Sequence, residues 1–208
     1  MKLFFTLALT GLLLGFLPTG ASAADTKTIV FFGDSLTAGY GLDDHTTMAF
    51  PGLIQKKIHD EGLPYTVINA GLSGDTSAGG LRRINWILRQ KVDIFVLELG
   101  GNDGLRGLPV ASTQANLQAI IDQVRAKNPN VKLVIAGMQM PISMGAYTQE
   151  FAAMYPALAK ANQATLIPFL LKDVGGVPEL NLPDGIHPTP EGHRRVSETI
   201  WPYLKPLL

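Results

Sequence analysis

Five short apolar runs of three to seven residues alternate along this 208-residue chain with segments of helical periodicity. The runs are rich in β-branched and aromatic residues, which is typical of strands buried on both faces. They are 28–32 (TIVFF), 66–68 (TVI), 93–99 (DIFVLEL), 132–136 (KLVIA) and 165–168 (TLIP). Because strands that alternate with helices form βαβ units, the pattern predicts an α/β fold with a mainly parallel five-stranded sheet and helices on both faces.

Four segments between these runs carry apolar residues three or four positions apart, the spacing of one helix face. These residues are Leu53, Ile54 and Ile58; Leu81, Ile84 and Leu88; Leu117, Ile120, Ile121 and Val124; and Phe151, Met154 and Leu158. A fifth helix is predicted over about 190–204. No internal repeat, low-complexity tract or charged tail divides the chain, so we expect a single domain over 24–208.

The first residues have the composition of a secretory signal peptide. Lys2 precedes an apolar run over 3–17, and the small residues Ala21, Ser22 and Ala23 follow it. We therefore predict cleavage after Ala23 and export, to the periplasm or to the medium. As a helix, the 15 residues of the run extend only about 22 Å against a hydrocarbon core of roughly 30 Å. We expect no stable membrane anchor after cleavage.

The charge balance and the absence of cysteine exclude several classes of function. Seventeen Lys and Arg residues balance 17 Asp and Glu residues, which argues against a protein that binds nucleic acid through its phosphates. The chain has no cysteine, so it has no disulfide framework, thiolate nucleophile, lipid-modified cysteine or cysteine-ligated metal. Covalent catalysis must therefore use another nucleophile. We expect a monomer or a weak oligomer.

Ligands of a parallel sheet gather at the carboxyl ends of its strands, so the loops that follow the strands are the first place to look for chemistry. In the loop after the first strand, Ser35 stands between a strand and a helix start, where its hydroxyl can face a cleft. One alternative is a serine that only caps the helix. Another is a glycine-rich phosphate cradle, which the absence of a G-x-x-x-x-G-K-S/T or G-x-G-x-x-G motif at this turn disfavours. In the loop after the second strand, the backbone N–H of Gly74 can donate to a developing negative charge. An ordinary turn into a helix capped by Asp75 or Thr76 is the alternative.

Two later loops carry polar side chains suited to catalysis. Asn102 follows the third strand and offers a neutral amide donor for an oxyanion, although asparagine is also a common turn residue. Asp184 precedes His187 by three residues, just before the last helix. This spacing lets the carboxylate accept from Nδ1 while Nε2 faces outward as a general base. The alternative is a histidine whose hydrogen bonds are satisfied within a turn.

Taken in order, these four loops resemble the signature of the GDSL or SGNH hydrolase family. The matching blocks are Gly33-Asp34-Ser35-Leu36, Gly74, Gly100-x-Asn102-Asp103 and Asp184-x-x-His187. The longer segments 33–42 (GDSLTAGYGL), 69–80 (NAGLSGDTSAGG) and 184–193 (DGIHPTPEGH) are similar to the branch of periplasmic arylesterases and thioesterase/lysophospholipase enzymes. The resemblance covers nearly all of the chain after the leader.

The resemblance implies a three-layer α/β/α sandwich of flavodoxin-like type, and the chain has no G-x-S-x-G nucleophile elbow. It implies that Ser35 is the nucleophile, that His187 is the general base and then the acid, and that Asp184 orients His187. The oxyanion hole would consist of the backbone N–H groups of Ser35 and Gly74 and the side-chain amide of Asn102.

The activity that this resemblance implies is that of a serine esterase for acyl or aryl esters, with thioesters and lysophospholipids as further substrates. It needs no cofactor and no metal. An acyltransferase or a carbohydrate deacetylase with the same triad is the alternative. A non-catalytic flavodoxin-like binding module is expected to have lost Ser35, Asp184 or His187, and all three are present.

Some other residues have less specific signals. His193 together with Asp184 and His187 offers a metal site, which the absence of an H-E-x-x-H spacing disfavours. His45 is expected in a polar loop and His59 on an exposed helix face. We expect Asp34 and Asp103 to supply supporting hydrogen bonds, and the aromatic residues Trp86, Trp201 and Tyr203 to pack in the core or between helices.

Two apolar loops are expected to flank the cleft, at 105–109 and 138–147. The second contains three methionines, whose flexible side chains can adapt to acyl chains of different length. The alternative places Met138 and Met140 in the core at the end of a strand.

Overall fold

The computed structural model describes residues 26–208, so the predicted signal peptide over 1–23 lies outside the described residues. Five strands form one sheet in the order β2-β1-β3-β4-β5, and all neighbouring strands are parallel. The strands are β1 (Lys27–Gly33), β2 (Tyr65–Gly71), β3 (Ile94–Glu98), β4 (Lys132–Ala136) and β5 (Thr165–Ile167). The predicted five-stranded parallel sheet is confirmed, and its strand order is that of flavodoxin-like folds.

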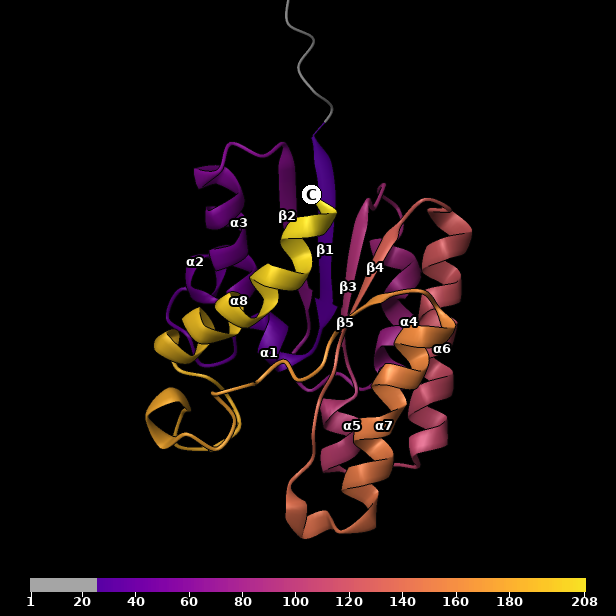
Figure 1. Ribbon diagram of the computed structural model, residues 1–208, viewed down its shortest axis with the longest axis vertical. Coiled ribbons are helices and arrows are strands. Elements are labelled where there is room, and N and C mark those ends of the chain that lie inside the picture. The colour runs from indigo at the N-terminus through magenta and orange to yellow at the C-terminus, as the bar shows by residue number, and fades with distance from the viewer. Residues whose placement is uncertain (1–25) are drawn as a thin grey trace, which may run out of the picture.

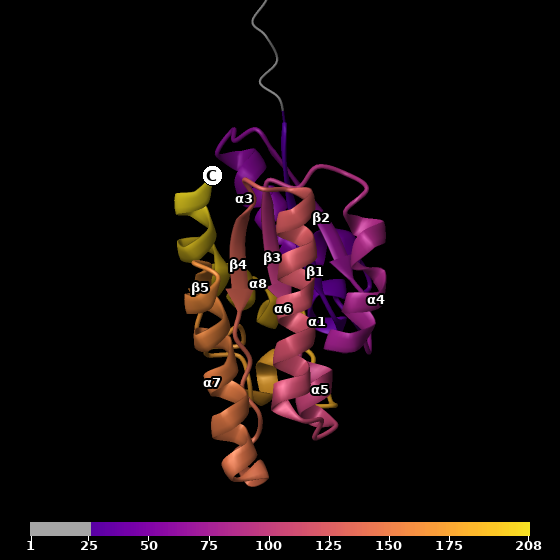
Figure 2. The ribbon, with the colours of Figure 1, turned by 90° about the vertical axis from the view of Figure 1, so that its right-hand side faces the viewer.

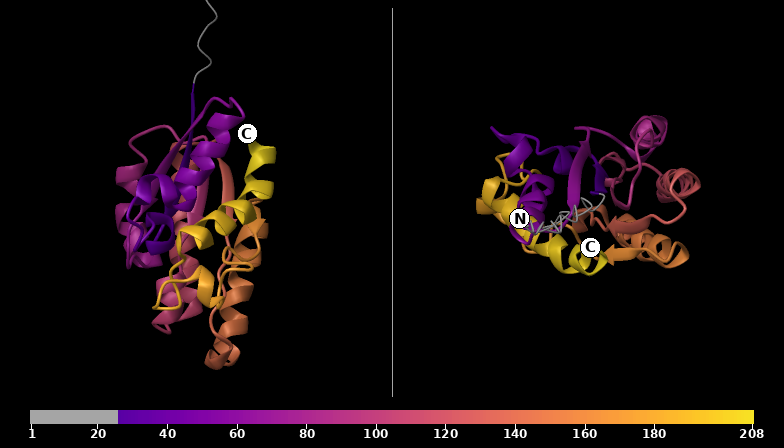
Figure 3. Two further views of the ribbon diagram at one scale, coloured as in Figure 1. Left: turned by 90° about the vertical axis from the view of Figure 1, so that its left-hand side faces the viewer. Right: turned by 90° about the horizontal axis from the view of Figure 1, so that it is seen from above.

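Helices cover both faces of the sheet and make the three layers visible in Figures 1 and 2. On one face lie α1 (Ser35–Ala38), α2 (His45–Met48), α3 (Phe50–Asp60) and α8 (Pro190–Leu204). On the other lie α4 (Ser77–Ile87), α6 (Val110–Lys127) and α7 (Ala146–Ala161), with the short α5 (Gly101–Leu105) at its end. The view from above in Figure 3 separates α3 and α8 from α4 and α6. Short 3₁₀ helices are η1 (Ile142–Met144), η2 (Pro178–Leu180) and η3 (Lys205–Leu207).

The core explains why the strand runs are apolar at successive positions instead of alternating. Phe31 and Phe32 of β1 are both fully buried, and they point to opposite faces of the sheet. Phe31 packs edge-on against Phe50 of α3, with ring centroids 5.7 Å apart. Phe32 lies on the face of the sheet that α4 covers, and a Cβ at Gly80 of α4 would come within 3.1 Å of its ring. Gly80 therefore lets α4 approach the sheet closely.

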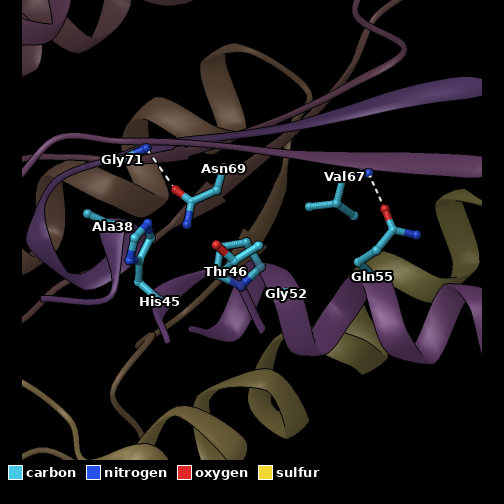
Figure 4. Close-up of a pocket in the computed structure, with 9 residues that line it drawn as sticks. Ala38, His45, Thr46, Gly52, Gln55, Val67, Asn69 and Gly71 are labelled. Atoms are coloured by element: carbon cyan, nitrogen blue, oxygen red, sulfur yellow. Dashed lines mark hydrogen bonds between the residues drawn. The ribbon is translucent and has the colours of Figure 1, made fainter. Parts of the chain in front are cut away.

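The outer edge of β2 is closed by side chains from the same chain, as Figure 4 shows. Gln55 of α3 accepts from the Val67 N–H at 2.6 Å and donates to the Tyr65 carbonyl at 3.3 Å. Asn69 accepts from the Gly71 N–H at 3.0 Å. These bonds occupy main-chain groups that an added strand would need, so they protect the sheet against edge-to-edge pairing.

Several element predictions need correction. Trp86 does not pack in the core: it is 67% exposed, because the buried face of α4 is formed by Ile84 and Ile87 and the side chain of Trp86 lies on the opposite side. Trp201 and Tyr203 pack against the core as predicted. The strand predicted over 66–68 runs from Tyr65 to Gly71, since its small and polar residues continue to pair with β1.

The last helix spans Pro190–Leu204, as predicted. The helix start predicted beside Ser35 is confirmed as α1, which is only four residues long. The short helices α2 and α5 were not predicted, because four or five residues show no periodicity. Over 26–208, none of the helices combines the length and the hydropathy that crossing a membrane requires.

Candidate active site

In Figure 1 the strands point downward, so their carboxyl ends face the lower half of the molecule, on the side of α1 and α5. The strand order reverses between β1 and β3, and this switch point is where α/β sheets of this type bind ligands. The loop with Ser35 follows β1 and the loop with Asn102 follows β3. A cleft of about 640 Å³ opens there, and Ser35, Gly74, Asn102 and His187 line it. The fold thus brings together four loops that are widely separated in sequence.

Ser35, His187 and Asp184 form a continuous hydrogen-bonded chain. The distance from Ser35 Oγ to His187 Nε2 is 2.8 Å, and the distance from His187 Nδ1 to Asp184 Oδ2 is 2.7 Å. The ring of Tyr40 lies against the His187 ring, with centroids 4.5 Å apart. This is the arrangement of a nucleophile, a base and a group that orients the base.

Local backbone structure positions each member of this chain. Ser35 is the first residue of α1, and the Asp34 carboxylate caps the helix by accepting from the Leu36 N–H at 3.0 Å. Asp184 Oδ1 accepts from the backbone N–H groups of Ile186 and His187, each at 3.0 Å, and this closes a tight turn that aims the imidazole ring.

The same hydrogen bonds keep Asp184 ionised. Partial burial acts to raise its pKa, but the bonds from the His187 ring and from the two backbone N–H groups outweigh it and lower the pKa of Asp184 to about 2. Asp184 is therefore a carboxylate at every pH at which a histidine can act as a base.

The amide of Asn102 is oriented by two acceptors at the floor of the site. Its Nδ2 donates to the Asp75 carbonyl at 3.0 Å and to Asp34 Oδ2 at 3.2 Å. Gly74 has a φ of +79°, a conformation that favours glycine, and its carbonyl accepts from Arg106 Nη2 at 3.1 Å. One cleft is thus lined by residues of three loops, Ser35, Gly74 and Asn102, and an oxyanion hole needs donors that converge in this way.

Asp34 and Asp103 supply supporting hydrogen bonds, as predicted. Asp103 accepts from the Ser77 N–H at 2.8 Å, from the Ser77 hydroxyl at 2.5 Å and from Thr113 Oγ1 at 3.3 Å, and so fixes α5 to α4 and α6. Asp34 is 2% exposed, and burial, opposed by hydrogen bonds from Leu36 and Asn102, raises the pKa of Asp34 to about 6.

Sequence reasoning missed Glu98, which lies directly beneath the turn that carries Ser35. Its buried Oε2 accepts from the Thr37 hydroxyl at 2.7 Å and from the Asp34 N–H at 3.2 Å. Burial, reinforced by the neighbouring Asp34 carboxylate, raises the pKa of Glu98 well above its ordinary range. The available signal was an acidic residue within the apolar run DIFVLEL.

The walls of the cleft are mostly apolar. Met138 and Met140 are both 6% exposed and both line the cleft. They are therefore buried at the end of a strand and also form part of the cleft wall, so both predictions for these methionines hold. Ile142 of η1 lies at the rim and is 91% exposed. The other apolar wall residues are Leu36, Tyr40, Leu105, Pro141, Phe169, Leu171 and Ile186.

The other histidines do not join the site. His193 is buried in α8, where its Nδ1 accepts from the Phe50 N–H at 3.3 Å and its ring stacks on Phe50. His45 was predicted in a polar loop but begins the short helix α2, where it is exposed. His59 is exposed on α3 as predicted. Among residues 26–208, no group of three or more histidine, aspartate or glutamate side chains is placed to hold a metal ion.

Comparison with known proteins agrees with this site. A sequence profile of the GDSL-like Lipase/Acylhydrolase family matches residues 31–195. Esterase TesA of Pseudomonas aeruginosa is 44% identical over 204 residues, which cover 97% of this chain and 98% of that protein. Thioesterase 1/protease 1/lysophospholipase L1 of Escherichia coli is 38% identical over 190 residues, or 90% of this chain and 87% of that protein.

Solved structures give the same result. A crystal structure of TesA superposes with a TM-score of 0.83 at 43% identity and covers 88% of this chain and 100% of that one. The esterase EstA from Pseudoalteromonas, inhibited by monoethylphosphonate, has a TM-score of 0.80 at 31% identity, with 86% and 97% of the two chains covered. The chain therefore belongs to the GDSL-like lipase/acylhydrolase family and is an ester hydrolase.

Proposed function

We propose that this hydrolase is a serine esterase in which Ser35, His187 and Asp184 act as the catalytic triad through an acyl-enzyme intermediate. The observation that carries the proposal is the pair of short contacts on either side of the His187 ring, 2.8 Å to Ser35 Oγ and 2.7 Å to Asp184 Oδ2. A base aligned in this way can take the serine proton during attack.

In the first half-reaction, Ser35 Oγ attacks the acyl carbonyl carbon while its proton passes to His187 Nε2. The N–H groups of Ser35 and Gly74 and the amide of Asn102 stabilise the tetrahedral oxyanion. The intermediate then collapses, and the leaving alcohol or thiol takes the proton from His187. The ionised Asp184 stabilises the imidazolium that forms in between.

In the second half-reaction, a water molecule replaces the leaving group. His187 takes a proton from this water as its oxygen attacks the acyl-enzyme carbonyl. The carboxylic acid leaves, and the proton returns to Ser35. An alcohol in place of water gives acyl transfer, so an added acceptor alcohol measures how the acyl-enzyme divides between the two products.

The cleft supports substrates with an apolar acyl or aryl group. Among the described residues that line it, none is Lys, Arg or Glu, and side chains such as Leu105, Met140 and Phe169 offer apolar contacts. Its rim at Ile142 is open to solvent, which leaves room for a bulky leaving group. We therefore propose acyl and aryl esters as substrates, with thioesters and lysophospholipids beside them, in line with the activities in the relatives' names.

The decisive experiment is hydrolysis of a chain-length series of p-nitrophenyl esters, an acyl-CoA and a lysophospholipid. We expect Ser35→Ala to lose at least about 10³-fold in kcat without loss of structure, because no other group takes over the attack. Ser112→Ala, on the exposed side of α6, is the matched control and should keep full activity. Near-normal hydrolysis by folded Ser35→Ala protein would contradict the proposal.

We also propose that residues 1–23 form a signal peptide and that the mature chain begins at Ala24, on the basis of the apolar run and the Ala21-Ser22-Ala23 triplet. Mass spectrometry of the protein from the periplasmic fraction and from the medium tests this. Recovery only of uncleaved chain from the cytoplasm would contradict it.

A further inference from the structure

Arg83 of α4 occupies an unusual place beneath the candidate oxyanion hole. Its side chain is only 21% exposed, and all three nitrogens of its guanidinium group donate hydrogen bonds. Nε donates to Asp75 Oδ2 at 2.7 Å, Nη1 to the Ala70 carbonyl at 2.9 Å and Nη2 to the Gly33 carbonyl at 2.9 Å. The group also lies 4.0 Å from the centroid of the Phe32 ring. It is therefore held in a single position.

The three acceptors lie at the ends of β1 and β2 or in the loop after β2, next to the backbone donors of the site. Gly33 ends β1 and is two residues before Ser35. Ala70 lies near the end of β2, and Asp75 directly follows Gly74. One side chain thus connects the strand ends from which the Ser35 N–H and the Gly74 N–H are presented.

The ion pair of Arg83 and Asp75 is also connected to Asn102, the third donor. The carbonyl of Asp75 accepts from Asn102 Nδ2 at 3.0 Å, so displacement of Asp75 also displaces the acceptor that orients this amide. Asp75 is 8% exposed, and a cation beside a buried carboxylate stabilises its charged form. Arg83 is that cation, and its position on α4 is fixed because Thr76 caps the helix.

Lysine cannot replace this arginine. The three acceptors lie in three directions around a planar group that stacks on Phe32, and an ammonium group is a point charge at the end of a flexible stem. Because Arg83 is not among the residues that line the cleft, its effect on catalysis is exerted through the loops and not by contact with substrate.

We propose that Arg83 is a positioning residue that sets the relative placement of the Ser35, Gly74 and Asn102 donors in the oxyanion hole. This inference rests on the proposed serine-esterase function. It predicts that changes at Arg83 reduce stabilisation of the oxyanion more than they reduce binding of the uncharged substrate.

The test compares Arg83→Lys and Arg83→Gln with Arg82→Lys, which changes the exposed neighbour on the same helix. The measurements are kcat and KM for a p-nitrophenyl ester, the melting temperature, and the inhibition constant of an alkyl trifluoromethyl ketone. Ser35 Oγ adds to the carbonyl carbon of this ketone, His187 takes the proton, and the oxyanion that forms occupies the hole.

We expect both Arg83 variants to lose roughly ten- to a hundredfold in kcat with KM within about twofold of the parent value, because a small displacement of preorganised donors has effects of this size. Affinity for the trifluoromethyl ketone should fall in the same proportion, and Arg82→Lys should change neither quantity. All rates are expressed per active site, counted by covalent labelling with a phosphonate, at a temperature at which the variant is folded.

A merely structural role for Arg83 would lower the melting temperature and the number of labelled sites, but leave kcat per labelled site and ketone affinity unchanged. That result in either variant overturns the inference, as does a loss confined to KM. If Arg83→Lys does not fold, Arg83→Gln alone decides, since it keeps a planar donor group without the charge. Activity in Ser35→Ala protein would instead contradict the proposed function, so the two failures are distinguishable.

Discussion

At the scale of single residues, Asn102 already has acceptors for its amide hydrogens before any substrate arrives. Its Nδ2 donates to the Asp75 carbonyl and to the Asp34 carboxylate. An oxyanion must compete with these acceptors, and the longer bond, 3.2 Å to Asp34, is the weaker competitor. In the mechanism that we propose, the free enzyme thus holds the amide close to the orientation that an oxyanion needs, so little reorganisation follows when charge develops on the substrate.

Removal of this amide should slow the chemical step and leave substrate binding nearly unchanged. For Asn102→Ala we expect kcat to fall by about 10²- to 10³-fold with little change in KM, because the donor acts mainly on the transition state. Steady-state kinetics with a p-nitrophenyl ester checks this, and Asn130→Ala, an exposed asparagine at the opposite end of the sheet, is the control. An effect confined to KM would argue against the oxyanion role.

The buried Glu98 makes the stability of the fold depend on pH. Burial and the Asp34 carboxylate raise its pKa well above 4.5, so the native state keeps a proton that the unfolded state has released. The stability that this proton provides is complete below the unfolded pKa and is lost as the pH rises through the folded pKa. A glutamine side chain at this position is neutral at every pH and has no such proton to lose.

We therefore expect Glu98→Gln to become more stable relative to the parent as the pH is raised from about 5 to about 8. Urea unfolding at both pH values measures the difference, and Glu179→Gln, an exposed glutamate in η2, should show no such trend. A difference that stays constant, or that shrinks as the pH rises, would show that Glu98 titrates in its ordinary range.

How far sequence predicts a site residue depends on how local its partners are. Asp184 and His187 are three residues apart, and their hydrogen bond follows from a single turn. Glu98 and Asp34 are 64 residues apart, and Arg83 and Gly33 are 50 apart. Contacts of the second kind form only when β1, β3 and α4 meet, so a pattern within one segment does not reveal them.

At the scale of elements, sequence predicts those whose pattern of buried and exposed residues is regular. β3 is buried at every position and α8 has one apolar face, and both were predicted within one or two residues. The end of β2 carries polar and small residues that pair with β1 but lack strand character. Trp86 was placed wrongly because an exposed tryptophan on α4 cannot be told from a buried one by residue type.

The packing of α8 on α3 contains a pH-sensitive contact at His193. Burial, followed by the charge of His187, lowers the pKa of His193 to about 4. Its Nδ1 accepts from the Phe50 N–H, so the neutral ring carries its proton on Nε2, for which the described residues offer no acceptor. A second proton on Nδ1 would face the Phe50 N–H and break this contact between the two helices.

We expect the burial of a neutral His193 ring to make the free energy of unfolding depend on pH by about 3 kcal/mol. The unfolded chain takes up the proton near pH 6.5 and the native protein only near pH 4, so stability is complete above about 6.5 and falls as the pH drops toward 4. Urea unfolding across this window should show a smaller loss for His193→Asn, whose amide oxygen can still accept from Phe50. His59→Asn, on the exposed face of α3, is the control, and equal losses in parent and His193→Asn protein would contradict the assignment.

At the scale of the whole molecule, the site exists only when the sheet is complete. Ser35 and His187 are 152 residues apart, and the donors between them come from the loops after β2 and β3. A ligand that contacts all these loops at once binds the native state and not the unfolded chain, so it must stabilise the fold as a whole.

Covalent modification of Ser35 by a p-nitrophenyl alkylphosphonate should therefore raise the melting temperature by several °C. The phosphonyl oxygen of the adduct takes the place of the oxyanion, and each charge-assisted hydrogen bond to it contributes about 1.5 to 3 kcal/mol. In a domain of this size, 1 kcal/mol corresponds to roughly 2 to 4 °C. Differential scanning calorimetry of the modified protein measures the shift, and mass spectrometry confirms a single adduct.

Two variants separate the contribution of the oxyanion hole from that of the bound alkyl group. Ser35→Ala should gain neither mass nor stability from the reagent. Asn102→Ala should be labelled more slowly and, once labelled, gain less in melting temperature than the parent protein, because one of its three donors is missing. An equal gain in the two labelled proteins would mean that Asn102 does not reach the oxyanion, and the hole would then consist of the Ser35 and Gly74 backbone donors alone.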